Sequence, residues 1–420
     1  MPSPNHPHVT QCTFHRIGES FDPFDADYLN DPYSFFAQAR AHAPIAYSPR
    51  LDRWLVTRYE DIVAILKDPQ RFSSRNMVTP LYPMIPEAKA ILESGLRITP
   101  TLVDCDPPKH THMRGFVNRA FSPRRMATLE PQIRDLVQQL INAFAGNQPV
   151  DLIQEFAFPL PALTIFTMIG VPDCDKDLVK SWCDDRLQLF FGILPPEGQV
   201  HCAHNIAACW RYCEQLVEQR LQEPQDDFTS DLLKVRRGNE ELLSLQEITS
   251  IIYGLSLAGH ETTTSLIGNC LKHLLSDLAI WRAVSEDPSL IPNIVEETLR
   301  HDTSLICWRR ITTEPVEVGG VSLPANTKLL LLLGSANHDD AQFANAEVFD
   351  IHRENARSHL SFGKGIHYCL GASLARLQTQ ITIQVMTTRF PGMRLVPDQT
   401  LEYSPNLSFR GPKQLLAEWG

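Results

Sequence analysis

The sequence lacks the marks of a secreted, disulfide-stabilised or membrane-spanning protein. Its ten cysteines are spread over 420 residues with no Cys-x-x-Cys pair, which is not a disulfide framework. Residues 1–20 hold no apolar segment of a signal peptide. The longest apolar stretch, residues 156–172, is interrupted by prolines and a glycine and predicts a buried helix. We therefore expect a soluble, cytoplasmic protein whose residues 1–20 are flexible.

An excess of basic residues is also missing. Lys and Arg total 38 against 49 Asp and Glu, so the formal net charge is −11, which argues against a protein that coats nucleic acid or an anionic membrane. An apolar fraction of 43% and a charged fraction of 21% exclude a disordered chain. The length suggests two or three domains. Because no internal repeat or linker is visible, we instead expect one domain over residues 1–420.

Apolar periodicity predicts a mainly α protein with small β-sheets. A mostly helical region is expected over residues 106–299, and a β-hairpin over residues 316–323 around two glycines. The other expected elements are a helix over residues 33–43, strands at 45–47 and 54–57, a helix over 59–67, a strand at 329–333, a loop-rich stretch over 335–371 and a final helix to about residue 390.

One long helix is predicted over residues 245–275, opened by the capping box Ser244-Leu-Gln-Glu247. Its middle reads Ala-Gly-His-Glu-Thr-Thr-Thr over residues 258–264. Glycine costs about 1 kcal/mol relative to alanine inside a helix, and threonine hydroxyls compete for backbone carbonyls, so a distortion is expected. Two interpretations stay open: a groove that holds a small ligand beside an acid and an alcohol, or a helix–helix packing notch. We expect His260 to be a structural or solvent-facing histidine rather than a catalytic one.

Glu297 and Arg300 stand three residues apart near the end of another predicted helix. At this spacing two side chains share a helix face and can form an ion pair. Taken alone, the pair is best interpreted as a surface ion pair of ~0–1 kcal/mol.

Cys369 differs from the other cysteines in its surroundings. Gly363, Gly365 and Gly371 flank it, and a predicted helix begins just after it. Glycines permit positive φ and close approach of a ligand, and a helix N-terminus stabilises a thiolate. Such a thiolate is either a nucleophile, which needs a base and an oxyanion site, or a ligand to haem iron, for which the glycines make room beside a flat ring.

Three segments together match a known family. The pattern Phe362-x-x-Gly365-x-His367-x-Cys369-x-Gly371 resembles the haem-binding loop of the cytochrome P450 superfamily. The pair Glu297-x-x-Arg300 resembles that family's Glu-x-x-Arg motif, and Ala258-Gly259-x-Glu261-Thr262 resembles its oxygen-activating helix motif. The resemblance implies the cytochrome P450 fold, with haem b between the central long helix and the Cys-ligand loop.

The resemblance also implies a role for each matching residue. Cys369 would bind the iron as a thiolate, Thr262 would hydrogen-bond dioxygen or a water, and Glu261 would relay protons. The resemblance implies haem contacts, with the propionates or the ring, from His110, Arg114, Arg310, His367, Phe362, Gly363, Gly365, Gly371, Ala258 and Gly259. Arg353 would be the third partner of the structural pair Glu297 and Arg300.

The implied activity is insertion of one oxygen atom from O2 into a small apolar or aromatic substrate. The expected substrate pocket is apolar and comprises Leu102, Leu255, Ala258, Leu305, Ile306 and Leu407. Two alternatives remain: a peroxygenase or other non-monooxygenase of the same fold, or a non-catalytic haem sensor.

Electrons are expected from another protein, a ferredoxin or a flavin/Fe–S reductase, because no flavin or Fe–S motif is present. Basic residues that the resemblance places near the Cys loop would steer an acidic partner: Arg119, Arg124, Arg125, Lys364 and Arg376. Segments 308–310, 335–339 and 408–412 resemble the catalytic domains of self-sufficient bacterial members, which are fused to their reductase. His201, Cys202 and His204 lack a clean zinc spacing and are interpreted as incidental.

Overall fold

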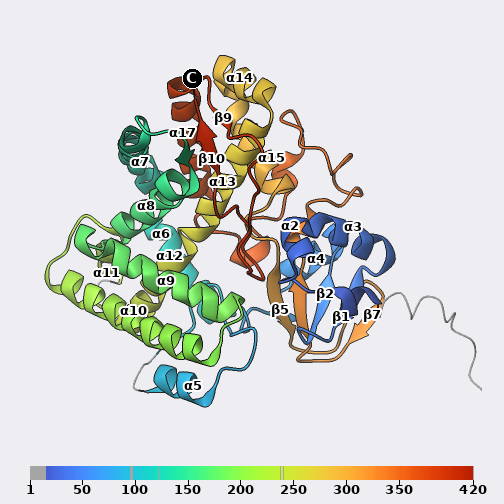
Figure 1. Ribbon diagram of the computed structural model, residues 1–420. Helices are drawn as coiled ribbons and strands as arrows, with labels where there is room; N and C mark the ends of the chain where they lie inside the picture. Colours follow the sequence, from blue (N-terminus) through green and yellow to red (C-terminus); the bar gives the residue numbers. More distant parts are fainter. Residues whose placement is uncertain (1–15, 95–97, 122, 237, 240, 420) are drawn as a thin grey trace, which may run out of the picture.

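The computed structural model describes residues 16–94, 98–121, 123–236, 238–239 and 241–419. A large helical part and a smaller sheet-containing part lie side by side, and helices α12 and α13 run through the middle of the helical part (Figure 1). Both the predicted mainly α fold and its small sheets are confirmed. Of the expected flexible N-terminus, residues 16–20 are helical and residues 1–15 lie outside the described residues.

Many helices begin at a proline, whose fixed φ suits the first helical turn. The helices are α2 (Ala26–Asn30), α3 (Pro32–His42), α4 (Tyr59–Lys67), α5 (Pro86–Glu93), α6 (Lys109–Ala120), α7 (Pro123–Phe144), α8 (Pro159–Ile169), α9 (Lys176–Phe191), α10 (Pro196–Gln222), α11 (Phe228–Val235), α12 (Leu245–Ala258), α13 (Glu261–Ser276), α14 (Leu278–Glu286), α15 (Ile291–His301), α16 (Leu333–Ala336) and α17 (Ala372–Arg389). Short helical turns are η1 (Ile153–Ala157), η2 (Asp173–Asp175), η3 (Pro288–Leu290), η4 (Ala356–Ser358) and η5 (Gly365–His367).

The strands form one larger mixed sheet and two small antiparallel ones. They are β1 (Ile45–Ser48), β2 (Arg53–Val56), β3 (Phe72–Ser73), β4 (Val150–Asp151), β5 (Trp308–Thr312), β6 (Val316–Val318), β7 (Val321–Leu323), β8 (Lys328–Leu331), β9 (Arg394–Leu395) and β10 (Leu416–Glu418). The larger sheet has the order β1-β2-β8-β5-β3, the second β4-β10-β9, and β6–β7 is the predicted hairpin. Gly319 and Gly320 have φ of 53° and 79°, as a two-residue hairpin turn of this kind requires.

The predicted central helix is two helices. The capping box at Ser244 and Glu247 is present, but α12 ends at Ala258 and α13 begins at Glu261. The hydroxyl of Thr262 donates to the carbonyl of Ala258 at 3.3 Å, in competition with the backbone. The expected distortion is therefore confirmed, whereas the expectation of one continuous helix is wrong.

The main hydrophobic core surrounds α12 and α13, which pack against α8, α9, α10, α15 and α17. The predicted buried helix of residues 156–172 contains α8, most of whose side chains are buried. No helix among the described residues is both long and apolar enough to cross a membrane. The helix α17 directly follows the Cys369 loop. Packing of these helices therefore fixes the start of α17 relative to the break in the central helix.

Candidate active site

The Cys369 loop is shaped by two glycines with positive φ. Gly363 and Gly365 have φ of 68° and 70°, and a Cβ at Gly365 would overlap the backbone oxygen of Leu66 in α4. The N–H of Cys369 donates to the carbonyl of Phe362 at 2.9 Å, which closes the loop. Gly371 has a φ of −82°, so two of the three flanking glycines adopt the positive φ that glycine permits. The loop thus presents the thiol of Cys369 in a fixed position.

Opposing effects act on the Cys369 thiol. Burial raises its pKa, and the N–H groups of Gly371 and Ala372 together with the guanidinium groups of Arg114 and Arg376 offset this rise only in part, so the pKa stays above its ordinary value. Two positive side chains and the start of α17 therefore surround the sulfur. This donor set suits a thiolate that binds a cationic metal centre.

Four cationic or neutral donors gather next to the loop, as the resemblance implied. The His110 ring lies 4.1 Å from the His367 ring between centroids, and the guanidinium of Arg114 donates to the carbonyl of Tyr368 at 2.8 Å. The His367 Nε2 lies 3.0 Å from the hydroxyl of Ser74. Arg310 is 2% exposed, and its guanidinium contacts a sulfur and a carbonyl rather than a carboxylate.

This cluster repels further positive charge. Burial and Arg114 lower the pKa of His110 to about 4, burial and Arg310 lower that of His367 to about 3, and burial lowers that of Arg310 to about 10. Neither ring nitrogen of His110 has a hydrogen-bond partner within the described part of the chain, although the residue is 1% exposed. A buried ring nitrogen without a partner costs free energy, and guanidinium groups favour carboxylates, so the two propionate carboxylates of haem b fit here. The residues present therefore fit the haem group.

One face of the central helices is open, with side chains that other residues do not fully cover. Ala258 is exposed, and Leu255 and Thr262 are partly exposed, whereas Ser256 and Leu257 are buried. These three residues lie about one turn apart and so share a face. Gly259 packs against α8, because a Cβ there would overlap the side chain of Ile165. The packing notch is therefore present at Gly259, and the ligand groove stays a prediction for the open face on another side of the helix.

Glu261 lies at the break, on the wall of a polar pocket. The pocket has a volume of about 320 Å³ and is also lined by Asp184, Gln188, Thr264 and Asn406. Burial raises the pKa of Glu261, which favours its protonated form, and Asp184 acts in the same direction. His260 is fully buried, and Asp184 and neighbouring anionic groups raise its pKa despite that burial. The carboxylic acid of Glu261 therefore borders this pocket, and the Thr262 hydroxyl follows one residue later, bonded to the Ala258 carbonyl.

Five of the six expected substrate-pocket residues fall into three separate clusters, and the sixth, Ala258, lies on the open face of the central helices. Leu102 and Leu255 are partly buried against the main core, and Leu305 is partly buried against the core beneath the larger sheet. Ile306 and Leu407 are 3% and 0% exposed within a third cluster. Phe409 was missed by the sequence analysis, although it is partly buried and forms a β-bridge with Leu305.

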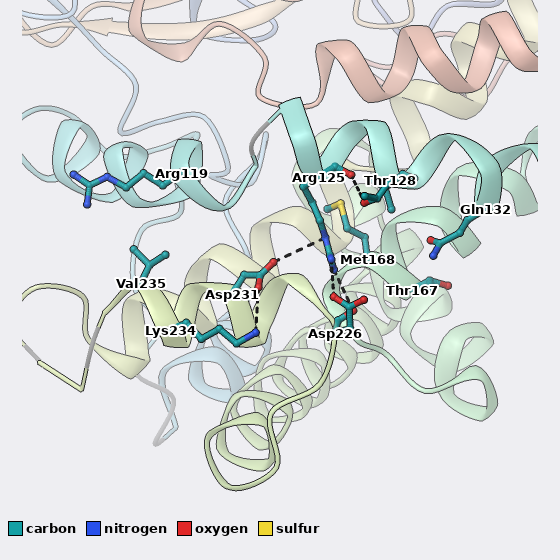
Figure 2. Close-up of a pocket in the computed structure, with 11 residues that line it drawn as sticks. Arg119, Arg125, Thr128, Gln132, Thr167, Met168, Asp226, Asp231, Lys234 and Val235 are labelled. Carbon is teal, nitrogen blue, oxygen red and sulfur yellow. Dashed lines mark hydrogen bonds and ion pairs between the residues drawn. The ribbon is translucent and has the colours of Figure 1, made fainter.

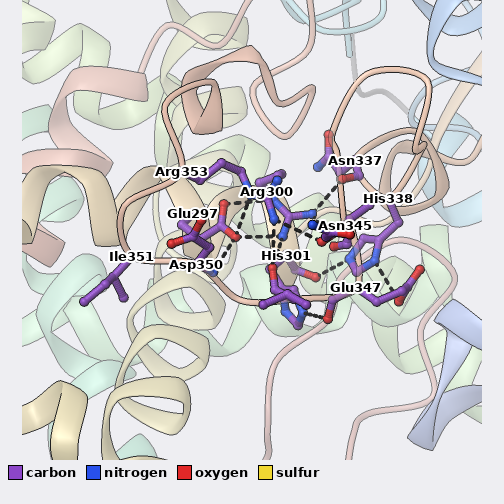
Figure 3. Close-up of polar contacts among 12 residues, drawn as sticks. Glu297, Arg300, His301, Asn337, His338, Asn345, Glu347, Asp350, Ile351 and Arg353 are labelled. Atoms are coloured by element: carbon purple, nitrogen blue, oxygen red, sulfur yellow. Dashed lines mark hydrogen bonds and ion pairs between the residues drawn. The ribbon is translucent and has the colours of Figure 1, made fainter.

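Glu297, Arg300 and Arg353 form a buried ion cluster (Figure 3). Arg300 donates to both carboxylate oxygens of Glu297 at 2.7 and 2.8 Å, and Arg353 Nε donates at 3.1 Å. Both Glu297 and Arg300 are fully buried, so the interpretation as a surface ion pair is wrong. The structure brings Arg353 to the pair, as the resemblance implied.

The expected basic docking residues differ in their availability. Arg125 is bound to Asp226 at 2.7 Å and lies 3.9 Å from Asp231, on the wall of a second pocket between α7 and α11 (Figure 2). Arg376 is bound to the buried carboxylate of Glu296 at 2.6 Å. The side chain of Arg124 lies outside the described residues. Arg125 and Arg376 therefore hold elements together, and Arg119 and Lys364 remain as candidates for partner contact.

Sequence reasoning missed contacts between distant segments. Glu296 holds both His359 and Arg376, and Asp184 of α9 faces His260 at the helix break. Motif spacing carries no signal for such pairs. His201 and Cys202 both face Asp185, and the described residues place no three-ligand cluster there.

Comparison with known proteins gives consistent matches. The family described as Cytochrome P450 matches residues 289–392. Cytochrome P450 107B1 of Saccharopolyspora erythraea is 35% identical over 93% of this chain and 96% of its own length. The structure of cytochrome P450 CREJ in complex with (4-ethylphenyl) dihydrogen phosphate is 38% identical with a TM-score of 0.92, over 96% of this chain and all of that chain. An intact type IV self-sufficient cytochrome P450 monooxygenase is 35% identical with a TM-score of 0.92, over 96% of this chain and 53% of that chain.

Proposed function

The chain belongs to the cytochrome P450 family, and we propose that Cys369, Thr262 and Glu261 are the residues with which it carries out monooxygenation. The protein is a haem-thiolate monooxygenase that uses haem b. When bound, the haem supplies the redox chemistry that transfers one oxygen atom of O2 to the substrate. The observation that carries our residue assignment is the Cys369 loop with its two positive-φ glycines, beside which the buried His110 ring has no hydrogen-bond partner among the described residues.

The proximal residues hold the cofactor. Cys369 is the thiolate ligand, since its sulfur faces N–H groups and two guanidinium groups. His110, Arg114, Arg310 and His367 bind the propionates, because each is a donor beside the loop. The glycines admit the ring close to the backbone.

The distal residues deliver protons. Glu261 lies on the wall of the polar pocket and can exchange a proton with water there, while Thr262 lies on the open face of the helix. The Thr262 hydroxyl donates to the Ala258 carbonyl, so a proton passed inward from Glu261 reaches a hydroxyl that is already oriented. This acid–alcohol pair favours an enzyme that consumes O2 over one that uses peroxide, because cleavage of O2 to water needs supplied protons.

The substrate is a small apolar or aromatic molecule. Leu102, Leu255, Leu305 and Phe409 provide partly exposed apolar surface. The solved relative that holds (4-ethylphenyl) dihydrogen phosphate supports an aromatic substrate for this chain as well. Insertion of oxygen into such a molecule is hydroxylation, dealkylation or epoxidation.

We further propose that residues 1–420 form one haem domain that receives electrons from a separate or formerly fused reductase. The match to the whole of one solved chain and to about half of a self-sufficient one supports this arrangement. Arg119, Lys364 and Tyr368, which is 41% exposed next to Cys369, form the proposed contact with the electron donor. A cytoplasmic location is supported by the free thiols of the described cysteines.

The proton role is tested with Thr262→Ala and Glu261→Gln in the haem-loaded protein with a surrogate ferredoxin and reductase. We expect product formation to slow on the order of 10²-fold in Glu261→Gln. In Thr262→Ala, we expect NAD(P)H to be consumed with hydrogen peroxide formed in place of product. Thr263→Ala, at the buried neighbouring position, is the matched control and should keep its coupling. Coupling that is unchanged in Thr262→Ala, or equal turnover with hydrogen peroxide alone, would remove these residues from the mechanism.

A further inference from the structure

His260 has a ring nitrogen that faces two carboxylates. Its Nδ1 lies 3.1 Å from the carbonyl oxygen of Ser256, and because a carbonyl only accepts, Nδ1 carries the proton. In the neutral form of the ring, Nε2 carries a lone pair that can bind a metal ion. Among the described residues this nitrogen makes no hydrogen bond, although the side chain is 0% exposed, and it points toward Asp184, whose Oδ1 lies 3.7 Å away.

The two carboxylates approach this nitrogen from different elements. Asp184 lies on α9, and its Oδ2 accepts from Lys180 at 2.7 Å, which leaves Oδ1 directed at His260. Glu261 is the first residue of α13, and no hydrogen bond or ion pair to its carboxylate is present among the described residues. One ligand atom from each of the three side chains lies within 4.8 Å of the others. Both carboxylates line the polar pocket, so the cluster is reached from solvent.

We propose that Asp184, His260 and Glu261 form a zinc-binding site at the break of the central helix. One imidazole nitrogen, two carboxylate oxygens and a water make the tetrahedral coordination that Zn²⁺ prefers. In such a site the ligand atoms lie about 3.4 Å apart, as follows from metal–ligand distances of about 2.1 Å. The ligand atoms here lie within 4.8 Å of one another, and rotation of the two half-buried carboxylate side chains shortens these distances to those of a zinc site. The bond from Nδ1 to a backbone carbonyl is the arrangement that orients metal-ligating histidines.

Zinc at this site acts on turnover through Glu261. A carboxylate that is a metal ligand cannot carry a proton at that oxygen, so bound zinc slows the delivery of protons. This effect rests on the proposed function, whereas binding of the metal rests only on the geometry of the three side chains.

Isothermal titration calorimetry, with ZnCl2 titrated into the tag-free, haem-loaded protein, tests the site. We expect one tight site in the wild type and at least roughly tenfold weaker binding in Asp184→Asn and in Glu261→Gln. Both substitutions nearly preserve side-chain shape, and the Asp184 side chain is 43% exposed, so folding is retained. His201→Ala is the matched control, because His201 faces Asp185 at 3.5 Å on the surface without a third ligand. MgCl2, which prefers oxygen ligands, should not compete.

Zinc binding of equal strength in the wild type, Asp184→Asn and Glu261→Gln would overturn the site, as would loss of the tight site in His201→Ala. A turnover assay separates this result from the proton role. Inhibition by zinc in the wild type supports both the site and the proposed role of Glu261. If zinc binding weakens in Asp184→Asn as expected, but zinc does not slow product formation in the wild type, the site is supported and the proton role of Glu261 is overturned.

Discussion

Glu297→Gln is the sharpest test of how the buried ion cluster stabilises this fold. The Glu297 carboxylate is fully buried and accepts from Arg300 at 2.7 and 2.8 Å, from Arg353 at 3.1 Å and from the N–H of Asp350 at 2.9 Å. The amide keeps the size of the side chain but removes its charge and replaces one acceptor with a donor. Two buried guanidinium groups then lose their carboxylate.

The expected loss of stability is large. Removing one partner of a buried ion pair costs about 3–5 kcal/mol, because it leaves uncompensated charge in the interior. Arg300 and Arg353 keep their backbone acceptors, which include the carbonyls of Asn337 and Ala344, so we expect the fold to persist. At about 2.1 cal/mol/K per residue, the entropy of unfolding of 420 residues is about 0.9 kcal/mol/K, so Tm falls by about 3–6 °C.

Thermal unfolding of the haem-loaded protein, followed by far-UV circular dichroism, measures this shift. Glu347→Gln is the matched control from the loop near the same cluster (Figure 3). Glu347 is 61% exposed and pairs with His338 at 3.2 Å and Arg40 at 3.9 Å, so its loss costs less than ~1 kcal/mol and about 1 °C. Equal shifts in the two variants, or a shift below about 1 °C in Glu297→Gln, would refute the assignment of stability to the buried cluster.

Three further outcomes are expected. Cys369→Ser should lose the reduced, CO-bound spectrum of thiolate-ligated haem, and a retained spectrum would exclude Cys369 as the ligand. Gly365→Ala should lower the ratio of haem to protein absorbance, because its Cβ overlaps the Leu66 backbone; Gly320→Ala, where φ is 79° but no atom lies within 4 Å, should leave the ratio unchanged. Burial and two histidines lower the pKa of His301 to about 3, below the unfolded value of ~6.5, so stability is lost as pH falls from 6.5 toward 3. His301→Gln should flatten that dependence in urea unfolding measured against pH, and an unchanged slope would contradict it.

Local sequence patterns predict the structure correctly where neighbouring residues in the chain decide it. The capping box before α12, the strand pair β1–β2 and the hairpin at Gly319 and Gly320 each depend on a few consecutive residues, and each is confirmed. The Gly and Thr content predicts a distortion of the central helix but not its division into two helices. The division depends on the packing of α12 and α13 on other helices, which stabilises both helix ends at the break.

The sequence by itself determined the chemistry: a cysteine among glycines, an acid beside an alcohol, and an acid–arginine pair at helical spacing. These patterns are short-range, so their residue types and spacing can be recognised without knowledge of the fold. Only the tertiary structure decided which cations are engaged, since Arg125 and Arg376 find carboxylates on distant elements. It alone placed Asp184 of α9 against His260, and it turned a pair expected at the surface into a buried cluster. Burial and contacts between distant segments depend on how helices pack, which no local spacing encodes.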